Sequence, residues 1–574
     1  MRFIGWFIAK TNFIDYNISV EISCAIYFSK ENGFRHALPP LWKGRSGVDG
    51  SGLRKAVAWR PDGRGKEKVL KMNMKKVAIL ADMHLPERTD TVKEPVFDWA
   101  LAEAKRRGVD MIVGAGDMTA MGTVGAARRL LEKLRATGLP FLNAPGNAEL
   151  RTSANRAEVL QMMNANQRLG NVVILDNARQ TLTDESKAFL KSLEAAGERN
   201  LLAVTHCPIF TMTVDEQVWL DHFIECGVIS CLVSGHKHQD TYDDHYPVVR
   251  GLDPDKAIGG PPCLVILTWN GTIWEREDVP CAFADPREWP EKAREEFLAH
   301  LGISTMADTI GGLKAAIEYR IPCVELRFEP TSKLSVEDVK ALLAEWRAMG
   351  GKSLSLHAPA IKPDESKDDV IGVDMVTAAS ELAVELGCQA VTMHVPHCHP
   401  VGKVVGQFRE HLLDAYAESL AALKMAGVAI SIENMHMVRG EKIDANRGYG
   451  YTPEECRSWI LALRNRMDYA NIGFHLDIGH ARNNAWYASR FNVSEWYVEM
   501  GRMLTGCHLH QVALWTSGKM ENHCPIKDLF GQYISLSSFF MAWRNGQLRH
   551  VPMYLEIRVE PSLESWISIN KELS

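Results

Sequence analysis

The sequence predicts a mixed α/β protein of two domains, in which a layered α/β sandwich precedes a (β/α)8 barrel. The chain has 574 residues, more than one hydrophobic core usually serves. Short apolar runs rich in β-branched residues alternate with amphipathic stretches, first between residues 74 and 280 and again between 306 and 574. The composition, 46% hydrophobic and 24% charged, is typical of a folded enzyme.

The first alternation contains seven strand-like runs, at residues 77–82, 111–117, 141–147, 172–177, 201–207, 231–238 and 263–269. Helical patterns such as residues 95–108 lie between them, so residues 74–280 are expected to form the sandwich. Residues 281–305 are rich in proline and charge and are expected to be a linker helix. Residues 1–73 fit neither domain, and their glycine, arginine and lysine content predicts a disordered or linker extension.

The second alternation also contains seven strand-like runs, at residues 323–328, 353–359, 390–396, 429–436, 472–480, 506–512 and 553–558. Their number and spacing over residues 306–574 indicate a (β/α)8 barrel. Part of its first βα unit is expected near Ile310. No repeat period is evident, so a solenoid is not supported.

Several classes of protein are disfavoured by composition. A net charge of −6 provides no overall basic field for tight nucleic-acid binding. The 12 cysteines form no C-x-x-C pair, so we expect reduced thiols and a cytoplasmic protein. No apolar run reaches the ~20 residues of a membrane span, and no membrane association is expected. The oligomeric state stays open.

Residues able to bind metals end five of the strand-like runs in the first domain: Asp82, His84, Asp117, Asn147, His206, His236 and His238. Glycines precede Asp117, Asn147 and His236, as sharp turns require. The five blocks in this order resemble those of calcineurin-like metallophosphoesterases over residues 75–277.

The resemblance implies a pair of divalent ions, of Mn, Fe, Zn or Ni, bridged by Asp117. One ion is then held by Asp82, His84 and His238, and the other by Asn147, His206 and His236. Asp117 and Asn147 are the candidate catalytic residues, because water activated between the ions attacks phosphorus.

One position departs from the resemblance. The family has a histidine that helps to protonate the leaving group where this chain has Ala148. Its loss predicts catalysis weaker by ~10²–10⁴-fold on esters with poor leaving groups. His222 or Lys237 could supply the proton instead, the substrate range could be restricted, or this domain could be a non-catalytic binding module.

The barrel has a second set of metal-binding residues at its expected strand ends: His357, His394, Glu433, Asp477, His480, His508, Glu521, His523 and Glu556. Barrel enzymes keep their chemistry at the carboxyl ends of the strands. The set resembles xylose-isomerase-like barrels and, among them, endonuclease IV. That resemblance implies one to three ions, of Zn or Mn, with Glu433 and Glu556 as bridging or closing carboxylates and candidate catalytic residues. Glu521 replaces the family's aspartate, and His397, His399 and His436 are candidate partners of the ligands.

Three functions remain open. The first is a two-centre phosphoesterase whose barrel cleaves a phosphodiester in a nucleic acid or a nucleotide. Acidic residues outnumber basic ones from Met306 onward, which makes a small or single-stranded substrate as plausible as duplex DNA. The second is a sugar isomerase or epimerase, fused to a sugar-phosphate phosphatase, with one ion held by Glu433, Asp477, His508 and Glu556. In the third, only the barrel is catalytic.

Overall fold

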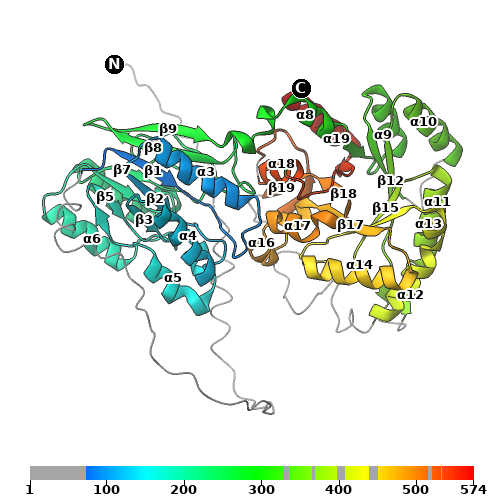
Figure 1. The fold of residues 1–574 in the computed structure, drawn as a ribbon, viewed down its shortest axis with the longest axis horizontal. Helices are drawn as coiled ribbons and strands as arrows, with labels where there is room; N and C mark the ends of the chain where they lie inside the picture. Colours follow the sequence, from blue (N-terminus) through cyan, green and yellow to red (C-terminus); the bar gives the residue numbers. More distant parts are fainter. Residues whose placement is uncertain are drawn as a thin grey trace, which may run out of the picture.

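The computed structural model describes residues 73–328, 335–364, 369–396, 408–437, 450–514, 520–531 and 533–574. The extension expected at the N-terminus therefore falls outside the described residues up to position 72. Two α/β bodies lie side by side (Figure 1). Within the described ranges, no helix combines the length and the apolar character that crossing a bilayer requires, and the cysteines are free thiols.

Two sheets form the first body. One has the order β3-β2-β1-β8-β9, with bounds Phe141–Ala144, Met111–Ala115, Lys76–Leu80, Cys263–Trp269 and Trp274–Pro280. The other has the order β4-β5-β6-β7, with bounds Arg168–Leu169, Val172–Ile174, Leu201–Val204 and Ile229–Val233. Each of the seven runs expected to be a strand overlaps one. The additional strands, β4 and β9, are the two-residue partner of β5 and a polar edge strand whose exposed positions hide its pattern.

A hydrophobic cluster joins the facing sides of the two sheets and includes Val77, Val113, Val204 and Val233. The outer sides are covered by α3 (Lys93–Arg106) and α4 (Val124–Ala136) on one sheet and by α6 (Asp184–Ala195) and α7 (Val214–Glu225) on the other. The short helix α5 (Arg156–Met162) packs beside α4. Because both faces of each sheet are covered, the loops after the strands are where polar side chains can gather.

The second body is a closed parallel barrel. Its strands, in order around the barrel, are β10 (Leu301–Ser304), β11 (Cys323–Arg327), β12 (Ser353–His357), β15 (Ala390–His394), β16 (Ala429–Glu433), β17 (Ile472–Asp477), β18 (Leu504–Leu509) and β21 (Met553–Leu555). Helices surround it: α9 (Thr309–Glu318), α10 (Val336–Ala348), α11 (Val373–Leu386), α12 (Arg409–Ser419), α13 (Ala421–Ala426), α14 (Pro453–Met467) and α19 (Val559–Leu573). The expected barrel is confirmed.

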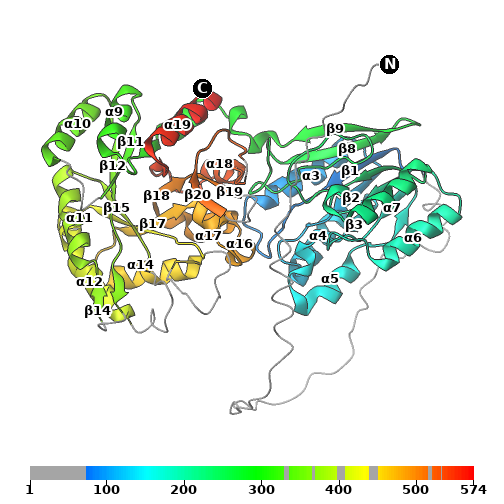
Figure 2. The same ribbon diagram turned by 180° about the vertical axis from the view of Figure 1, so that it is seen from behind.

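Further elements follow the carboxyl ends of the strands. They are the hairpins β13–β14 (Lys362–Asp364, Asp369–Ile371) and β19–β20 (Gln511–Leu514, Met520–Cys524), and the helices α15 (Ile478–Arg482), α16 (Tyr487–Arg490), α17 (Val493–Met500) and α18 (Ser537–Arg544). In both views, α16 and α17 lie on the side of the barrel that faces the first body (Figures 1 and 2).

The barrel begins before Met306, inside the stretch expected to be a linker. That stretch does contain a helix, α8 (Glu291–Leu298), but β10 follows it directly. β10 closes the barrel by pairing with both β11 and β21. Its run of four residues is too short for a strand pattern to be recognised. Gly302 is required there, because a Cβ at this position would lie 1.9 Å from the carbonyl oxygen of Cys323.

A buried lysine lies beside the junction of the two bodies. Lys93 Nζ, at the start of α3, lies 2.7 Å from Asp253 Oδ1 and 3.2 Å from Asp255 Oδ2. Asp255 Oδ2 also accepts a hydrogen bond of 2.9 Å from Ser494 Oγ, which belongs to α17 of the barrel. At the periphery, Arg88 Nη1 donates to Glu499 Oε1 at 2.5 Å. Ionic and polar contacts therefore fix the first body against the barrel.

We expect Lys93→Met to destabilise the protein by roughly 3–5 kcal/mol, because it leaves two buried carboxylates without their cation. The thermal unfolding midpoint measures this loss. Lys105→Met is the matched control, since Lys105 lies exposed on the same helix. Equal midpoints for the two variants would contradict a structural role for Lys93.

Candidate metal centres

The backbone at the first set of candidate ligands is sharply turned. Five of these residues adopt positive φ angles: Asp82 (49°), His84 (46°), Asp117 (50°), His236 (71°) and His238 (54°). Residues other than glycine rarely adopt this conformation, and its strain is typical of functional sites. Gly146 permits a close approach, because a Cβ there would lie 2.2 Å from the Asp117 nitrogen. These turns direct the side chains from several strand ends toward one point.

Asp117 lies at the middle of this first centre. Its Oδ2 is 3.1 Å from His84 Nε2, and its Oδ1 is 3.4 Å from His206 Nε2. The backbone nitrogen of Ala148 donates to Oδ1 at 2.6 Å. Burial acts to raise the pKa of Asp117, but the neighbouring His206 and His84 outweigh it and hold this pKa well below its usual range. The carboxylate is thus ionised and between two groups of ligands.

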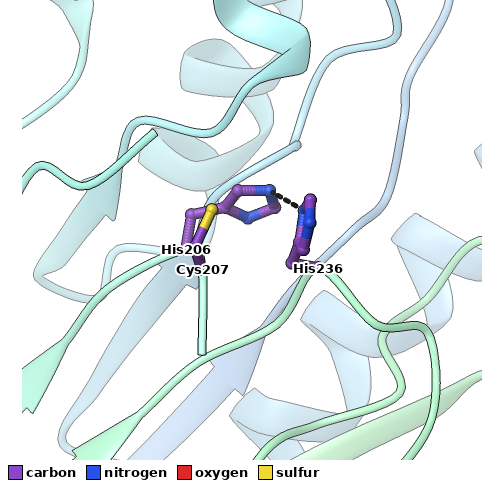
Figure 3. Close-up of side chains that lie close together, drawn as sticks. All are labelled: His206, Cys207 and His236. Carbon is purple, nitrogen blue, oxygen red and sulfur yellow. Dashed lines mark hydrogen bonds between the residues drawn. The ribbon is translucent and has the colours of Figure 1, made fainter. Parts of the chain in front are cut away.

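Those two groups lie on either side of Asp117. On one side, Asn147 Oδ1 is 2.9 Å from His206 Nε2 and 3.1 Å from His236 Nδ1, and the two ring nitrogens are 3.1 Å apart. Figure 3 shows these rings with Cys207 beside them. On the other side, Asp82, His84 and His238 bring their ligand atoms within 4.8 Å of one another.

The polar atoms of the first centre fit divalent ions. Asp82 Oδ1 and His238 Nδ1 are buried without a hydrogen-bond partner among the described residues. Burial lowers the pKa of His206 to about 4, and it lowers the pKa of His238 well below its ordinary value. Neutral imidazole nitrogens and ionised carboxylates are the donors that transition metals bind.

Two acidic residues that contact ligands of the first centre were not predicted from the sequence. Glu149 accepts hydrogen bonds from the backbone nitrogens of Asp117 (3.0 Å) and Gly146 (2.8 Å), which holds the turn together. Asp253 Oδ2 lies 3.3 Å from His84 Nδ1, on the side of the ring opposite Asp117. Glu149 could have been found as the acid that ends the third block. Asp253 follows no strand-end pattern.

The positions of His222 and Lys237 do not show that either residue replaces the missing histidine as a proton donor. The side chain of His222 lies on α7, is 56% exposed, and has Nε2 2.7 Å from Glu194 Oε1. Lys237 follows His236 and lies 6.0 Å from the Phe210 ring centre. Ala148 itself is buried.

Glu433 occupies the middle of the barrel centre, at the end of β16. Four imidazoles surround its carboxylate: Oε2 is 3.1 Å from His357 Nε2 and 3.3 Å from His394 Nε2, and Oε1 is 3.3 Å from both His480 Nδ1 and His508 Nδ1. The strand register explains the arrangement, since His394 pairs with Glu433 across β15 and β16. Adjacent strand ends of the closed barrel thus converge on one carboxylate.

Two further carboxylates complete this cluster. Glu556 Oε2, just after β21, is 3.2 Å from His508 Nδ1 and 3.5 Å from His523 Nδ1. Asp477 Oδ2 is 3.5 Å from His480 Nδ1 and 3.9 Å from His508 Nδ1. Eight of the nine candidate ligands in the barrel therefore share one buried network.

The ninth candidate, Glu521, lies exposed on β20. A residue not singled out from the sequence, His510, lies next to the cluster instead: its Nε2 is 3.1 Å from Asp477 Oδ2, and its ring lies 4.5 Å from that of His523. The spacing His508-x-His510 could have identified His510 from the sequence, because alternate residues of an extended segment share a face.

The candidate partners of the ligands are only partly described. His397 and His399 lie outside the described residues. The ring of His436 stacks on that of His480 at 4.6 Å between centroids.

Polar residues inside the barrel contact the His508 ring and hold its orientation. Glu325 Oε1, on β11, is 2.7 Å from His508 Nε2, and Thr392 Oγ1 donates to Glu325 Oε2 at 2.9 Å. The ring of His475 lies 4.0 Å from that of His508. With Nε2 held by Glu325, Nδ1 of His508 faces Glu433 and Glu556. Glu325 was not predicted as part of the site, because it is the single carboxylate within a strand-like run.

The barrel centre also fits metal ions. Glu433 Oε1, His508 Nδ1 and Glu556 Oε2 are buried without hydrogen-bond partners in the described part of the chain. Buried polar atoms are costly unless they are paired, and a cation between them would satisfy all three.

We expect Glu325→Gln to weaken metal binding in the barrel by ~10–100-fold, because the amide holds His508 less firmly than the carboxylate does. Competition with a chelator, followed by elemental analysis, measures this change. Glu337→Gln, at an exposed position on α10, is the control. Unchanged metal retention in Glu325→Gln would rule out this positioning role.

Comparison with known proteins identifies the barrel. Among solved structures, a D-tagatose 3-epimerase-like protein is 20% identical, with 48% of this chain and 97% of that chain covered and a TM-score of 0.33. An L-ribulose 3-epimerase is 14% identical, with 48% and 94% covered and a TM-score of 0.36. The 3-keto-D-glucoside 4-epimerase of E. coli is 14% identical, with 48% and 98% covered and a TM-score of 0.33. No curated protein matches the chain. A family model described as a xylose isomerase-like TIM barrel matches residues 313–571, in the C-terminal part of the chain.

Proposed function

We propose that the chain is a metal-dependent phosphoesterase with two centres, in which the barrel cleaves a phosphodiester and the first body hydrolyses a phosphoester. One observation carries this proposal. His357 and His394 contact Glu433, although neither histidine is among the four ligands that one-ion chemistry needs. Extra imidazoles on a shared carboxylate favour a cluster of several ions, which can hold both the attacking and the leaving oxygen.

In the barrel, divalent ions would be held by the eight residues of the buried network and would supply Lewis acidity and a nucleophile at neutral pH. Glu433 is central enough to be shared between ions. Arg327 Nη1 donates to Glu556 Oε1 at 2.9 Å, which orients Glu556. The remaining oxygen of Glu556 then faces His508.

In the first body, the arrangement of six ligands around Asp117 supports the same class of chemistry. Asp117 contacts ligands from both groups, as a bridging carboxylate would. The buried methyl group of Ala148 supplies no proton to a leaving group. We therefore propose that this centre prefers esters whose leaving groups depart without protonation.

A sugar isomerase or epimerase is the second candidate for the barrel. His508 Nδ1 lies 3.3 Å from Glu433, 3.2 Å from Glu556 and 3.9 Å from Asp477, a compact set for a single ion. The match to the xylose isomerase-like family also favours this candidate. In it, Glu433 and Glu556 would move the proton.

Substitutions in the barrel separate the two candidates. If several ions cleave a phosphodiester, His357→Ala and His394→Ala should each abolish most phosphodiesterase activity and release metal, because each removes an imidazole ligand. If one ion supports isomerisation, Glu433→Gln and Glu556→Gln should abolish turnover while the histidine variants keep their metal. Activity assays with metal analysis distinguish these outcomes.

The assay requires an Asp117→Asn background, so that the first centre does not contribute. Phosphodiesterase activity retained in both histidine variants would overturn the multi-ion proposal. Isomerase activity on a panel of sugars and sugar phosphates, lost in the two glutamate variants, would establish the second candidate.

Metal analysis tests whether the two centres are separate. We expect Asp117→Asn to lose metal from the first body while the barrel keeps its own, because Asp117 contacts ligands of both groups there. Glu556→Gln should show the reverse. The same metal content in wild type and Asp117→Asn would contradict a metal centre in the first body.

A further inference from the structure

A third group of possible metal ligands lies on the first body, away from both centres. It consists of Glu194 on α6 and of His222 and Cys226 at the end of α7, where Cys226 directly follows the last helical residue. One ligand atom from each of the three side chains lies within 4.8 Å of the other two. The group combines a carboxylate, an imidazole and a thiol.

The direction of the chain places this group at the edge of the sheet opposite the first centre. β5, β6 and β7 run parallel to one another, and the ligands of the first centre follow the carboxyl ends of the strands. α6 connects β5 to β6 and α7 connects β6 to β7, so each helix ends near the amino end of the next strand. The two helices lie next to each other on the outer face of their sheet (Figure 2). The group is therefore separate from the first centre.

The helical spacing brings His222 and Cys226 to one face of α7. The Cys226 nitrogen donates to the His222 oxygen at 2.9 Å, so the two residues are one helical turn apart. Glu194 reaches them from α6, because its Oε1 lies 2.7 Å from His222 Nε2 and 3.7 Å from Cys226 Sγ. One carboxylate oxygen thus contacts a ring nitrogen and a sulfur of the neighbouring helix.

These separations are close to those of a zinc site. Zinc binds sulfur at ~2.3 Å and nitrogen or oxygen at ~2.0 Å with tetrahedral angles, which places pairs of ligand atoms roughly 3.3–3.5 Å apart. The distance between Glu194 Oε1 and Cys226 Sγ, 3.7 Å, is close to this range. The hydrogen bond between Glu194 and His222 has to open by about 0.6 Å to admit an ion. Rotation of the two side chains allows this, because they are 35% and 56% exposed.

The type of donor and the helix ends both favour a cation. Sulfur, nitrogen and oxygen together suit zinc, whereas a thiolate ligand is unsuitable for magnesium or calcium. Glu194 lies in the last turn of α6, and Cys226 follows the last residue of α7. The C-terminal end of a helix carries a partial negative charge that stabilises a nearby cation. Two such ends meet at this group.

We propose that Glu194, His222 and Cys226 bind a zinc ion that joins the ends of α6 and α7. Three protein ligands leave the fourth tetrahedral position to water. Binding releases the proton of the Cys226 thiol to solvent, because the thiolate is the form that binds the metal. The ion holds together two helices that cover one face of a sheet, so it acts on the stability of the first body. The proposal does not rest on the chemistry of either centre.

Cobalt(II), which can occupy zinc sites, tests this proposal on the full-length protein after both centres have been loaded with manganese. A thiolate bound to cobalt gives a charge-transfer band in the near ultraviolet, which nitrogen and oxygen ligands alone do not give. We expect the wild type to show this band and Cys226→Ser to lose it. Cys524→Ser is the matched control and should keep the band, because Cys226 and Cys524 are the cysteines of the described residues that are not buried.

His222→Ala and Glu194→Gln should each weaken cobalt binding about tenfold or more, since even the loss of a residue that only supports a ligand costs ~10–100-fold in affinity. His245→Ala, at an exposed position of the first body, should leave binding unchanged. Zinc should abolish the band by displacing cobalt, and it should raise the thermal unfolding midpoint of the wild type but not that of Cys226→Ser. A band of equal strength in Cys226→Ser, or no band in the wild type at saturating cobalt, would overturn the proposal.

Discussion

The buried contact of Lys93 with Asp253 and Asp255 lies between the first centre and the barrel. Asp253 reaches His84 of the first centre, and Asp255 accepts a hydrogen bond from Ser494 of the barrel. Separating the bodies would remove the hydrogen bond that Asp255, itself paired with Lys93, accepts from Ser494. The segment that contains Asp253 and Asp255 therefore contacts both a ligand of the first centre and a helix of the barrel.

The two bodies bring their ligands together by different physical means. In the first body, strained turns with positive φ redirect residues such as Asp117 and His236 from separate strands. In the barrel, strand register brings several of them together, since closure places His394 beside Glu433 and Asp477 beside His508. The first centre thus depends on a few turn residues and their glycines, whereas the barrel centre depends on closure of the whole sheet, including the short strand β10.

The sequence predicted most strands and most members of both clusters, because these residues end apolar runs in a recognisable order. It did not predict Glu325, His510 or Asp253, whose positions depend on packing between elements distant along the chain. The strand β10 was missed because four residues hold too little pattern. Contacts across the junction, such as that between Asp255 and Ser494, have no local signal at all, since they arise only when two folded bodies meet.

The protonation of the imidazoles around Glu433 bears on the number of ions. Burial disfavours the charged forms of His480 and His394. At His480, Asp477 and Glu433 overcome burial and raise the pKa to about 9. At His394, burial prevails over Glu433, and the adjacent His357 and His480 lower the pKa further, well below its ordinary value. A neutral ring beside a shared carboxylate has a free nitrogen lone pair, which is what a metal ion requires. Chemistry with one ion, bound through His508, leaves that lone pair unused, whereas a cluster of ions uses it.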